Sequence, residues 1–249
     1  MSTPCFSPKT LTFLRGLKRN NNREWFNANR PRFEEHVRAP MVALVEQLAL
    51  DLPAIAPDLI AEPKRSIYRI YRDTRFSPDK TPYKTHVAAI FPHRDLPKHE
   101  GAGLYVHIAL DGVFVGGGLY RPQPRQLAKL REYIAGHHRQ LRAIVAAPPF
   151  QETFGDLAGE RLQRTPRGYA ADHPAADLLR LKQYLAGRVH EPAFATDPRF
   201  YASLLRDFTV LVPVVRYLNG PLTTAEALLE EALTGEEARR PSRGASAGR

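Results

Sequence analysis

Apolar residues recur at helical spacing at both ends of the chain. Ser7-Pro8 is a typical helix start, with serine as the N-cap and proline in the first turn. Leu11, Leu14 and Leu17 then follow at steps of three. This pattern predicts two or three N-terminal helices that end near Leu52-Pro53. Further helices are predicted in the second half of the chain, from Pro122 or Pro124 to Val145, at 175–185 and at 199–218.

In the middle of the chain the pattern changes to the two-residue period of β-strands. Strands are predicted at Arg65–Asp73, Lys84–Phe91, Leu104–Leu110 and Val113–Tyr120, and a short strand at Glu160–Thr165 inside an otherwise irregular stretch from Pro148 to His173. Helices followed by a block of strands and then by helices are typical of α+β proteins. We therefore expect an antiparallel sheet of about four to five strands, packed with N-terminal and C-terminal helices.

Asp111-Gly112 is the strongest hairpin signal in the chain. A two-residue turn there pairs Ile108 with Val115, so that the paired residue numbers sum to 223. On the other face of the sheet, the register predicts His107 opposite Gly116 and Tyr105 opposite Gly118. In this register the two hydrogen-bonding side chains, Tyr105 and His107, lie opposite glycines, which have no side chain. This arrangement indicates either a hollow that receives a ligand or room for the two rings to pack.

Length and composition favour one domain with a real core. The chain has 249 residues, of which 43% are hydrophobic, so we expect one α+β domain at 1–222 and a mostly disordered tail at 223–249. No apolar run approaches the roughly 20 residues that cross a membrane, and the N-terminus does not read as a signal peptide. We expect a cytoplasmic protein with no membrane partner. Cys5, the single cysteine, excludes an internal disulfide.

The positive charge is concentrated in one segment. Between Lys64 and His86 there are seven Lys or Arg and two Asp, which is +5 of the formal net charge of +10. Aromatic residues are interleaved with them, and arginine suits bidentate binding of phosphate or carboxylate. We therefore predict a site for an anion. The candidate ligand-binding residues are Arg69, Tyr71, Arg72, Arg75, Lys80, Tyr83, Lys84, Tyr105, His107, Gly116 and Gly118.

Catalysis is left open by the sequence. Asp73, Asp79 and His86 are the candidate general acids or bases, and only their geometry can decide between them. The chain has no His-Glu-x-x-His zinc motif. We predict no metal site, and no cofactor is indicated.

The charged segment resembles a known family signature. Arg69-x-x-Arg72-Asp73-x-Arg75-Phe76-x-x-Asp79-Lys80-x-x-Tyr83 is similar to the defining motif of domain-of-unknown-function family 2461. The flanks Asn21–Phe26, Gly116–Tyr120 and Pro166–Tyr169 resemble that family too, so the resemblance spans about Phe6 to Leu222. The family has no established activity, substrate or cofactor. The resemblance implies that the signature residues act as one constellation.

Three functions are compatible with these patterns. The first is a site that binds an anionic small molecule or nucleotide, bearing phosphate or carboxylate, whether or not it is turned over. The second is a structural or interaction protein whose Arg-Asp cluster is an internal ion-pair network. The third is nucleic-acid binding, for which the chain shows basic charge and aromatic residues but no known reader motif.

Overall fold

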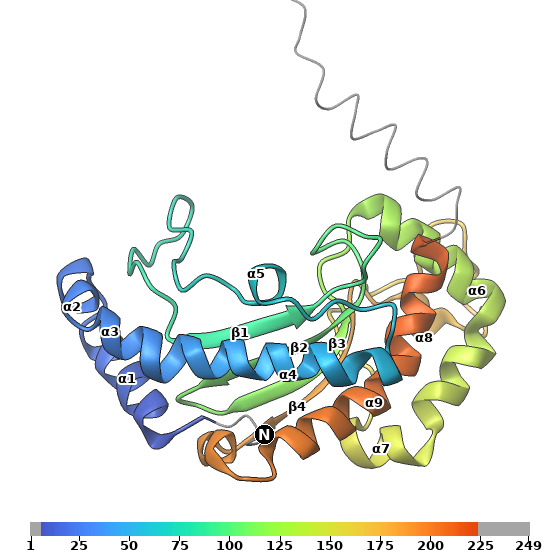
Figure 1. The fold of residues 1–249 in the computed structure, drawn as a ribbon. Coiled ribbons are helices and arrows are strands. Elements are labelled where there is room, and N and C mark those ends of the chain that lie inside the picture. Colours follow the sequence, from blue (N-terminus) through green and yellow to red (C-terminus); the bar gives the residue numbers. More distant parts are fainter. Residues whose placement is uncertain (1–5, 224–249) are drawn as a thin grey trace, which may run out of the picture.

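The fold was established from a computed structural model that describes residues 6–223. Helices and strands alternate in blocks along the chain (Figure 1). The helices are α1 (Pro8–Arg19), α2 (Arg23–Ala28), α3 (Arg30–Phe33), α4 (Ala39–Ile55), α5 (Pro63–Ser66), α6 (Pro124–Ala146), α7 (Pro148–Phe154), α8 (Ala176–Leu179) and α9 (Phe200–Asn219), with a π-helical turn η1 (Glu34–Arg38) and 3-10 turns η2 (Pro192–Thr196) and η3 (Gly220–Leu222).

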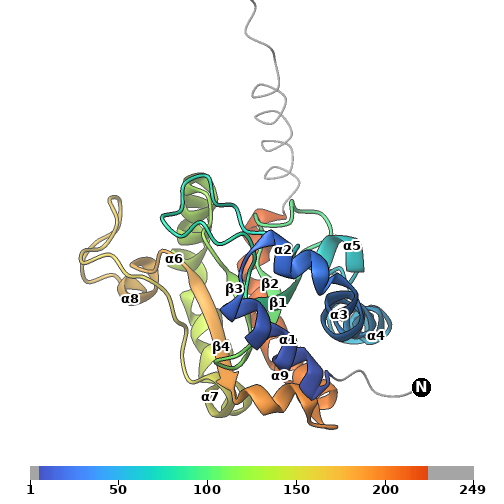
Figure 2. The same cartoon turned by 90° about the vertical axis from the view of Figure 1, so that its left-hand side faces the viewer.

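Four strands form one antiparallel sheet in the order β1 (His86–Phe91), β2 (Gly103–Ala109), β3 (Val113–Leu119) and β4 (Tyr184–His190). Figure 2 shows β1 at the edge beside α4, and β4 at the opposite edge beside α7. The prediction of an α+β fold with an antiparallel sheet is confirmed.

One face of the sheet packs against α9 and forms the core. Val106 and Ile108 of β2 and Val115 of β3 are fully buried there, and Phe91 packs edge-on against Phe208 of α9, with their ring centroids 5.5 Å apart. The alternate residues of the same strands project to the opposite face. This second face includes Tyr105 and His107, which are only half-buried.

The N-terminal helices begin at a capping residue or at a proline in the first turn. Asn22 caps α2 by accepting a hydrogen bond from the Trp25 backbone N–H at 2.9 Å. The backbone from Arg30 to Ile55 is helical throughout, because Pro31 and Pro40 each occupy a first-turn position of a helical segment. The structure accommodates the intervening residues by widening into the π-helical turn η1.

The predicted strand at Arg65–Asp73 is wrong. Pro63 begins a short helix, α5, and the chain that follows is extended but makes only isolated bridges, Ile67 with Ala89 and Tyr71 with Tyr83. Pro82 lies opposite this segment and accepts a hydrogen bond from Arg72 N–H, but proline has no N–H to return one. Regular pairing alongside β1 is therefore interrupted.

Three predictions in the second half of the chain are also wrong. The stretch expected to be irregular from Pro148 begins with the helix α7, and Glu160–Thr165 makes one isolated bridge, between Arg161 and Leu181, instead of a strand. The helix expected at 175–185 ends at Leu179. Tyr184 then begins β4, because this segment pairs with β3 along the edge of the sheet.

The β2–β3 hairpin has the predicted faces but not the predicted register. Its two-residue turn is Leu110-Asp111, closed by a hydrogen bond from Ala109 N–H to Gly112 O at 2.9 Å. Ile108 therefore pairs with Val113, Tyr105 with Gly116, and His107 with Phe114. A shift of two residues preserves the alternation of side chains between the two faces, so the hydrophobic pattern does not distinguish the two registers.

No helix among residues 6–223 is long and apolar enough to cross a membrane. The tail predicted at 223–249 lies outside the described residues from position 224 onward.

Candidate functional site

The face of the sheet that does not pack on α9 contains a pocket of about 440 Å³, which we call the sheet-face pocket. Its floor comes from all four strands, and its rim comes from residues that precede β1, β2 and α6. Its lining consists of Tyr68, Lys84, His86, Ile90, His99, Gly101, Gly103, Tyr105, His107, Phe114, Gly117, Gly118, Tyr120, Leu185 and Ala186. Five of the residues predicted from the sequence are therefore brought together here: Lys84, His86, Tyr105, His107 and Gly118.

Glycines in β3 and β4 leave space at the floor of the sheet-face pocket, because they have no side chains that would fill it. The Phe114 ring lies across Gly116 and Gly187, where an added Cβ would approach ring carbons to 2.7 and 2.4 Å. At Gly118, φ is +121° and an added Cβ would lie 2.0 Å from Tyr184 O, so a side chain is excluded by backbone. The glycines of β3 thus make room for Phe114 and for close strand approach, rather than for Tyr105 and His107 as the predicted register required.

The rim combines aromatic rings with lysines. Tyr68 stacks on His99 with ring centroids 5.8 Å apart, and two ammonium groups lie over the Tyr68 ring, Lys84 Nζ at 5.0 Å and Lys98 Nζ at 4.6 Å from its centroid. Burial lowers the pKa of Lys84, with Arg69 adding repulsion, and burial lowers the pKa of Lys98, with Lys84 and Arg65 adding repulsion. Desolvation and mutual repulsion both disfavour these cations while no anion is near them.

Two histidines meet on the floor. The rings of His86 and His107 are 5.4 Å apart, and His107 stacks on Phe114 at 5.6 Å. Burial, then the neighbouring His107 and Lys84, lower the pKa of His86 to about 4. Burial also lowers the pKa of His107, and it raises the pKa of Tyr105 to about 12. At neutral pH the floor therefore presents neutral His86 and a protonated Tyr105 hydroxyl, groups that donate or accept hydrogen bonds.

None of the residues lining the sheet-face pocket is Asp or Glu. The nearest acidic influence on its histidines is Asp111 in the β2–β3 turn, which opposes the lowering of the pKa of His86 and of His107. A pocket with a lysine, three histidines and three tyrosines but no carboxylate can accept negative charge from outside.

The arginine-rich part of the signature lies elsewhere, in the loop 72–82 that projects beyond the sheet (Figure 1). Arg72 donates to Asp79 and to Thr81. Arg75 forms a two-bond pair with Asp73, with Nε–Oδ1 at 3.0 Å and Nη2–Oδ2 at 2.8 Å. Lys80 Nζ donates to Thr74 O at 2.9 Å.

Hydrogen bonds from these arginines set the acidity of the loop. Arg75 holds the pKa of Asp73 at about 2, with smaller contributions from its own backbone N–H and from Arg69. Arg72, followed by Thr81, does the same for Asp79. Both carboxylates are fully ionised at neutral pH and already engaged with arginine, so neither is placed to abstract a proton from a ligand in the sheet-face pocket.

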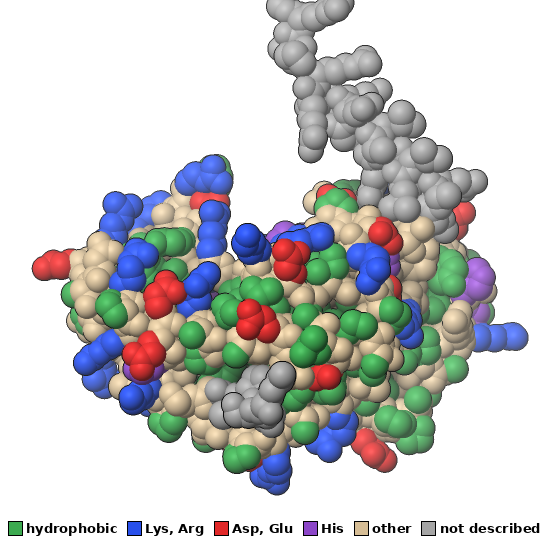
Figure 3. Space-filling model, in the orientation of Figure 1, with side chains coloured by type: hydrophobic (Ala, Val, Ile, Leu, Met, Phe, Trp, Pro, Cys, Tyr) green, Lys and Arg blue, Asp and Glu red, His purple; other side chains and the backbone are tan. Residues whose placement is uncertain are grey.

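The other predicted residues occupy two further places. Tyr83 is buried against Phe26, with the rings stacked at 4.1 Å. Arg69 and Tyr71 line a separate cavity on the helical side of the segment 67–71. Figure 3 shows Lys and Arg side chains gathered around a hollow in this part of the surface, near the loop 72–82.

The candidate residues listed from the sequence leave out five aromatic or charged residues of the site: Tyr68, Lys98, His99, Phe114 and Tyr120. Lys98 and His99 belong to the charged loop between β1 and β2, and Tyr120 follows β3 directly. Tyr68 has the only usable signal in the sequence, because it alternates with Arg69 inside the basic segment.

Two asparagines fix the segments that carry the rim. Asn219 accepts from Ala102 N–H at 2.7 Å and donates to Ala102 O at 3.0 Å, entirely in the interior. Asn21 makes the same pair of bonds to the backbone of Tyr83, at 3.1 and 3.0 Å. Each side-chain amide replaces the partner that a neighbouring strand would provide. The first clamp ends the loop that carries Lys98 and His99, and the second precedes Lys84.

Within residues 6–223, no three His, Cys, Asp or Glu side chains lie close enough to hold a metal ion together.

Comparison with known proteins gives one match. The family model described as "Conserved hypothetical protein (DUF2461)" matches residues 9–217. Neither the search of curated proteins nor the search of solved structures found a match.

Proposed function

Since the chain belongs to the conserved family DUF2461, whose description carries no activity, we propose a function from the site itself: the sheet-face pocket binds a small anion that bears a planar ring. Nucleotides and aromatic phosphates or carboxylates have this chemistry. The proposal narrows the expectation of an anionic ligand to one pocket and one combination of groups.

The observation that carries the proposal is the charge imbalance of the lining. Lys84, with Lys98 above the same Tyr68 ring, faces a pocket without a carboxylate. Burial costs each ammonium part of its hydration, which is why their pKa values are lowered. An anion bound between the two ammonium groups would compensate their lost hydration and their mutual repulsion. Its binding is therefore favoured by electrostatic attraction to both lysines.

The aromatic lining supports a ring in the ligand. Tyr68, Tyr105 and Phe114 surround the hollow over the β3 and β4 glycines, and Tyr68 meets Tyr105 edge-on at 6.3 Å. Flat apolar faces beside hydrogen-bonding hydroxyl and imidazole groups favour a planar polar ring. For the loop 72–82, in contrast, the pairs Arg72–Asp79 and Arg75–Asp73 favour the internal ion-pair network.

A thermal-shift panel of nucleotides, aromatic phosphates and aromatic acids would test the proposal, because a ligand that binds only the folded state raises the melting temperature. The best compound is then titrated calorimetrically against Lys84→Gln and against Lys18→Gln, an exposed charge change on α1. We expect about a tenfold loss for Lys84→Gln and none for Lys18→Gln. Equal affinity of wild type and Lys84→Gln, or no stabilising compound, would refute it.

A further inference from the structure

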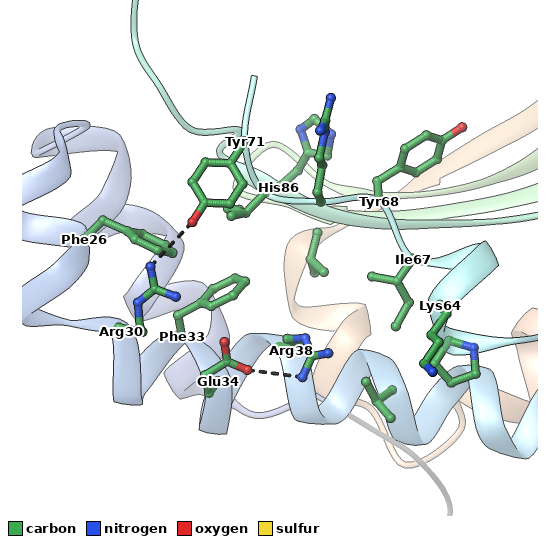
Figure 4. A pocket seen from close by; sticks show the side chains of 15 residues that line it. Phe26, Arg30, Phe33, Glu34, Arg38, Lys64, Ile67, Tyr68, Tyr71 and His86 are labelled. Carbon is green, nitrogen blue, oxygen red and sulfur yellow. Dashed lines mark hydrogen bonds and ion pairs between the residues drawn. The ribbon is translucent and has the colours of Figure 1, made fainter. Parts of the chain in front are cut away.

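A second cavity lies on the helical side of the extended segment 67–71 (Figure 4). It has a volume of about 310 Å³ and is enclosed by α2, α3, η1 and α4 on one side and by residues 63–71 on the other. We call it the helix-side pocket. Tyr68 and His86 line both this pocket and the sheet-face pocket, so one layer of chain separates them.

Four cations and one carboxylate line the helix-side pocket: Arg30, Arg38, Lys64 and Arg69, with Glu34. Glu34 is engaged by Arg38 at 3.3 Å. Arg30, Lys64 and Arg69 have no carboxylate within 4.0 Å among residues 6–223, although Arg69 is near enough to Asp73 to help lower its pKa, after the hydrogen bonds from Arg75. Three positive charges therefore face one cavity without a bound counter-charge.

Two contacts orient the Arg30 guanidinium at one end of the helix-side pocket. The guanidinium lies 5.5 Å from the centroid of the Phe26 ring and donates from Nη2 to the Tyr71 hydroxyl at 3.5 Å, as Figure 4 shows. The Tyr71 oxygen accepts that bond, and among the described residues its own hydrogen donates to no acceptor. Arginine and tyrosine thus present two donors, positioned before any ligand arrives, at the same end of the pocket.

The walls between these polar groups are apolar. Phe26, Phe33 and Val42 come from the helices, and Ile67 and Ile70 come from the opposite segment. Figure 4 shows Phe33 and Ile67 on the two sides of the cavity, below Tyr71. A bare ion such as inorganic phosphate would leave these walls uncovered, whereas an apolar chain or ring would bury them.

We propose that the helix-side pocket is a separate binding site for an amphiphilic anion, a carboxylate or phosphate joined to an apolar body. The acidic head lies among Arg30, Arg69 and the Tyr71 hydroxyl, and the apolar body lies against Phe33, Val42 and Ile67. This site does not depend on the function proposed for the sheet-face pocket.

Calorimetric titration of the full chain with octanoate tests the proposal, with acetate as the probe that has the same head and lacks the apolar body. We expect octanoate to bind and acetate to bind at least about tenfold more weakly, since several methylenes are buried. Arg30→Gln and Arg69→Gln should each weaken octanoate about tenfold, the usual size for a charged hydrogen bond.

Two matched variants separate the alternatives. Arg32→Gln removes an exposed charge from the same helix as Arg30 but outside the pocket, and Lys84→Gln alters the sheet-face pocket alone; both should bind octanoate like wild type. The proposal is overturned if octanoate does not bind, if acetate binds as well, if Arg32→Gln loses as much as Arg30→Gln, or if only Lys84→Gln loses affinity. Arg69 is exposed, so Arg69→Gln should fold normally, and circular dichroism verifies this. A loss of octanoate binding in this variant then reports on the pocket even if Arg30→Gln fails to fold.

Discussion

His86 shows how a single buried side chain couples the site to pH. Its ring lies on the pocket floor beside His107, with Lys84 nearby and no carboxylate in the lining. Burial and these neighbours lower its pKa to about 4 from the ordinary 6.5. Between these two pH values the unfolded chain binds a proton at this position that the folded chain does not bind.

Because the folded pKa is the lower one, neutral His86 contributes stability that is fully present above about pH 6.5 and is lost as the pH falls towards 4. After allowance for its partial exposure, the loss amounts to roughly 1–2 kcal/mol. We predict that His86→Gln has a flatter stability profile than wild type in urea melts at pH 7.5 and 4.5. If both proteins lose the same free energy of unfolding over this interval, His86 is not the group that titrates.

At the scale of elements, the asparagine clamps decide where irregular segments lie. Asn219, at the end of α9, holds the backbone of Ala102 just before β2 begins. The loop 92–102 thereby ends at a fixed point, and this loop carries Lys98 and His99 of the site. Regular strand pairing does not provide this anchor, because the partner is a side chain from the far end of the described chain.

Asn219→Ala should lower the free energy of unfolding by about 2–4 kcal/mol, since it leaves a buried N–H and a buried C=O without partners. Urea melts measure this loss, and Asn27→Ala, on the exposed face of α2, is the matched control with no expected change. The same variant should weaken any ligand of the sheet-face pocket, because Lys98 and His99 lose their anchor. A stability close to that of wild type would mean that water satisfies Ala102.

The sequence predicts the elements that have a strong hydrophobic period. It fails where a residue or strand distant in the sequence determines the secondary structure of a segment. The helix from Pro8, the helix from Phe200 and the β2–β3 pair were predicted because burial repeats along each of them. The strand expected at Arg65–Asp73 was not formed because Pro82 opposes it. The strand β4 was missed because the mixed apolar and polar sequence 178–186 fits a helix as well as a strand until its partner β3 is known.

The candidate site was predictable in its floor but not in its rim. Tyr105 and His107 lie on the predicted face because a two-residue period allows only two faces. Lys98 and His99 could not be assigned, since the path of the loop 92–102 depends on Asn219. The cluster of arginines drew attention to the loop 72–82, where Asp73 and Asp79 engage them. Net charge along a sequence does not distinguish a paired cation from an unpaired one.

For the whole molecule, the distribution of the charge matters more than its total. Half of the formal +10 lies between residues 64 and 86, and Lys and Arg side chains gather there around a hollow (Figure 3). Such a surface attracts any polyanion at low salt, whether or not a specific ligand exists. Attraction of this kind has to be separated from binding in either pocket.

Ionic strength separates the two. Binding of a 20-nucleotide single-stranded DNA, followed by fluorescence anisotropy, should weaken roughly 20- to 50-fold between 50 and 200 mM salt if three or four phosphates are contacted. Binding of a monoanionic pocket ligand should weaken no more than about threefold over the same range. DNA binding that remains tight at 200 mM salt and is abolished by Lys84→Gln would instead favour a nucleic-acid function for the sheet-face pocket.

The order of the strands has a consequence for how the chain reaches this structure. β1, β2 and β3 are consecutive and pair locally, whereas β3 pairs with β4 across the whole of α6, α7 and α8. Closing so long a loop is slow relative to forming a hairpin. During synthesis and refolding, the outer edge of β3 is therefore exposed until β4 arrives, and unpaired edges of this kind recruit other chains. Gly116-Gly117-Gly118 occupies that edge. Because these three residues have no side chains, a strand from another chain would gain few side-chain contacts by pairing there.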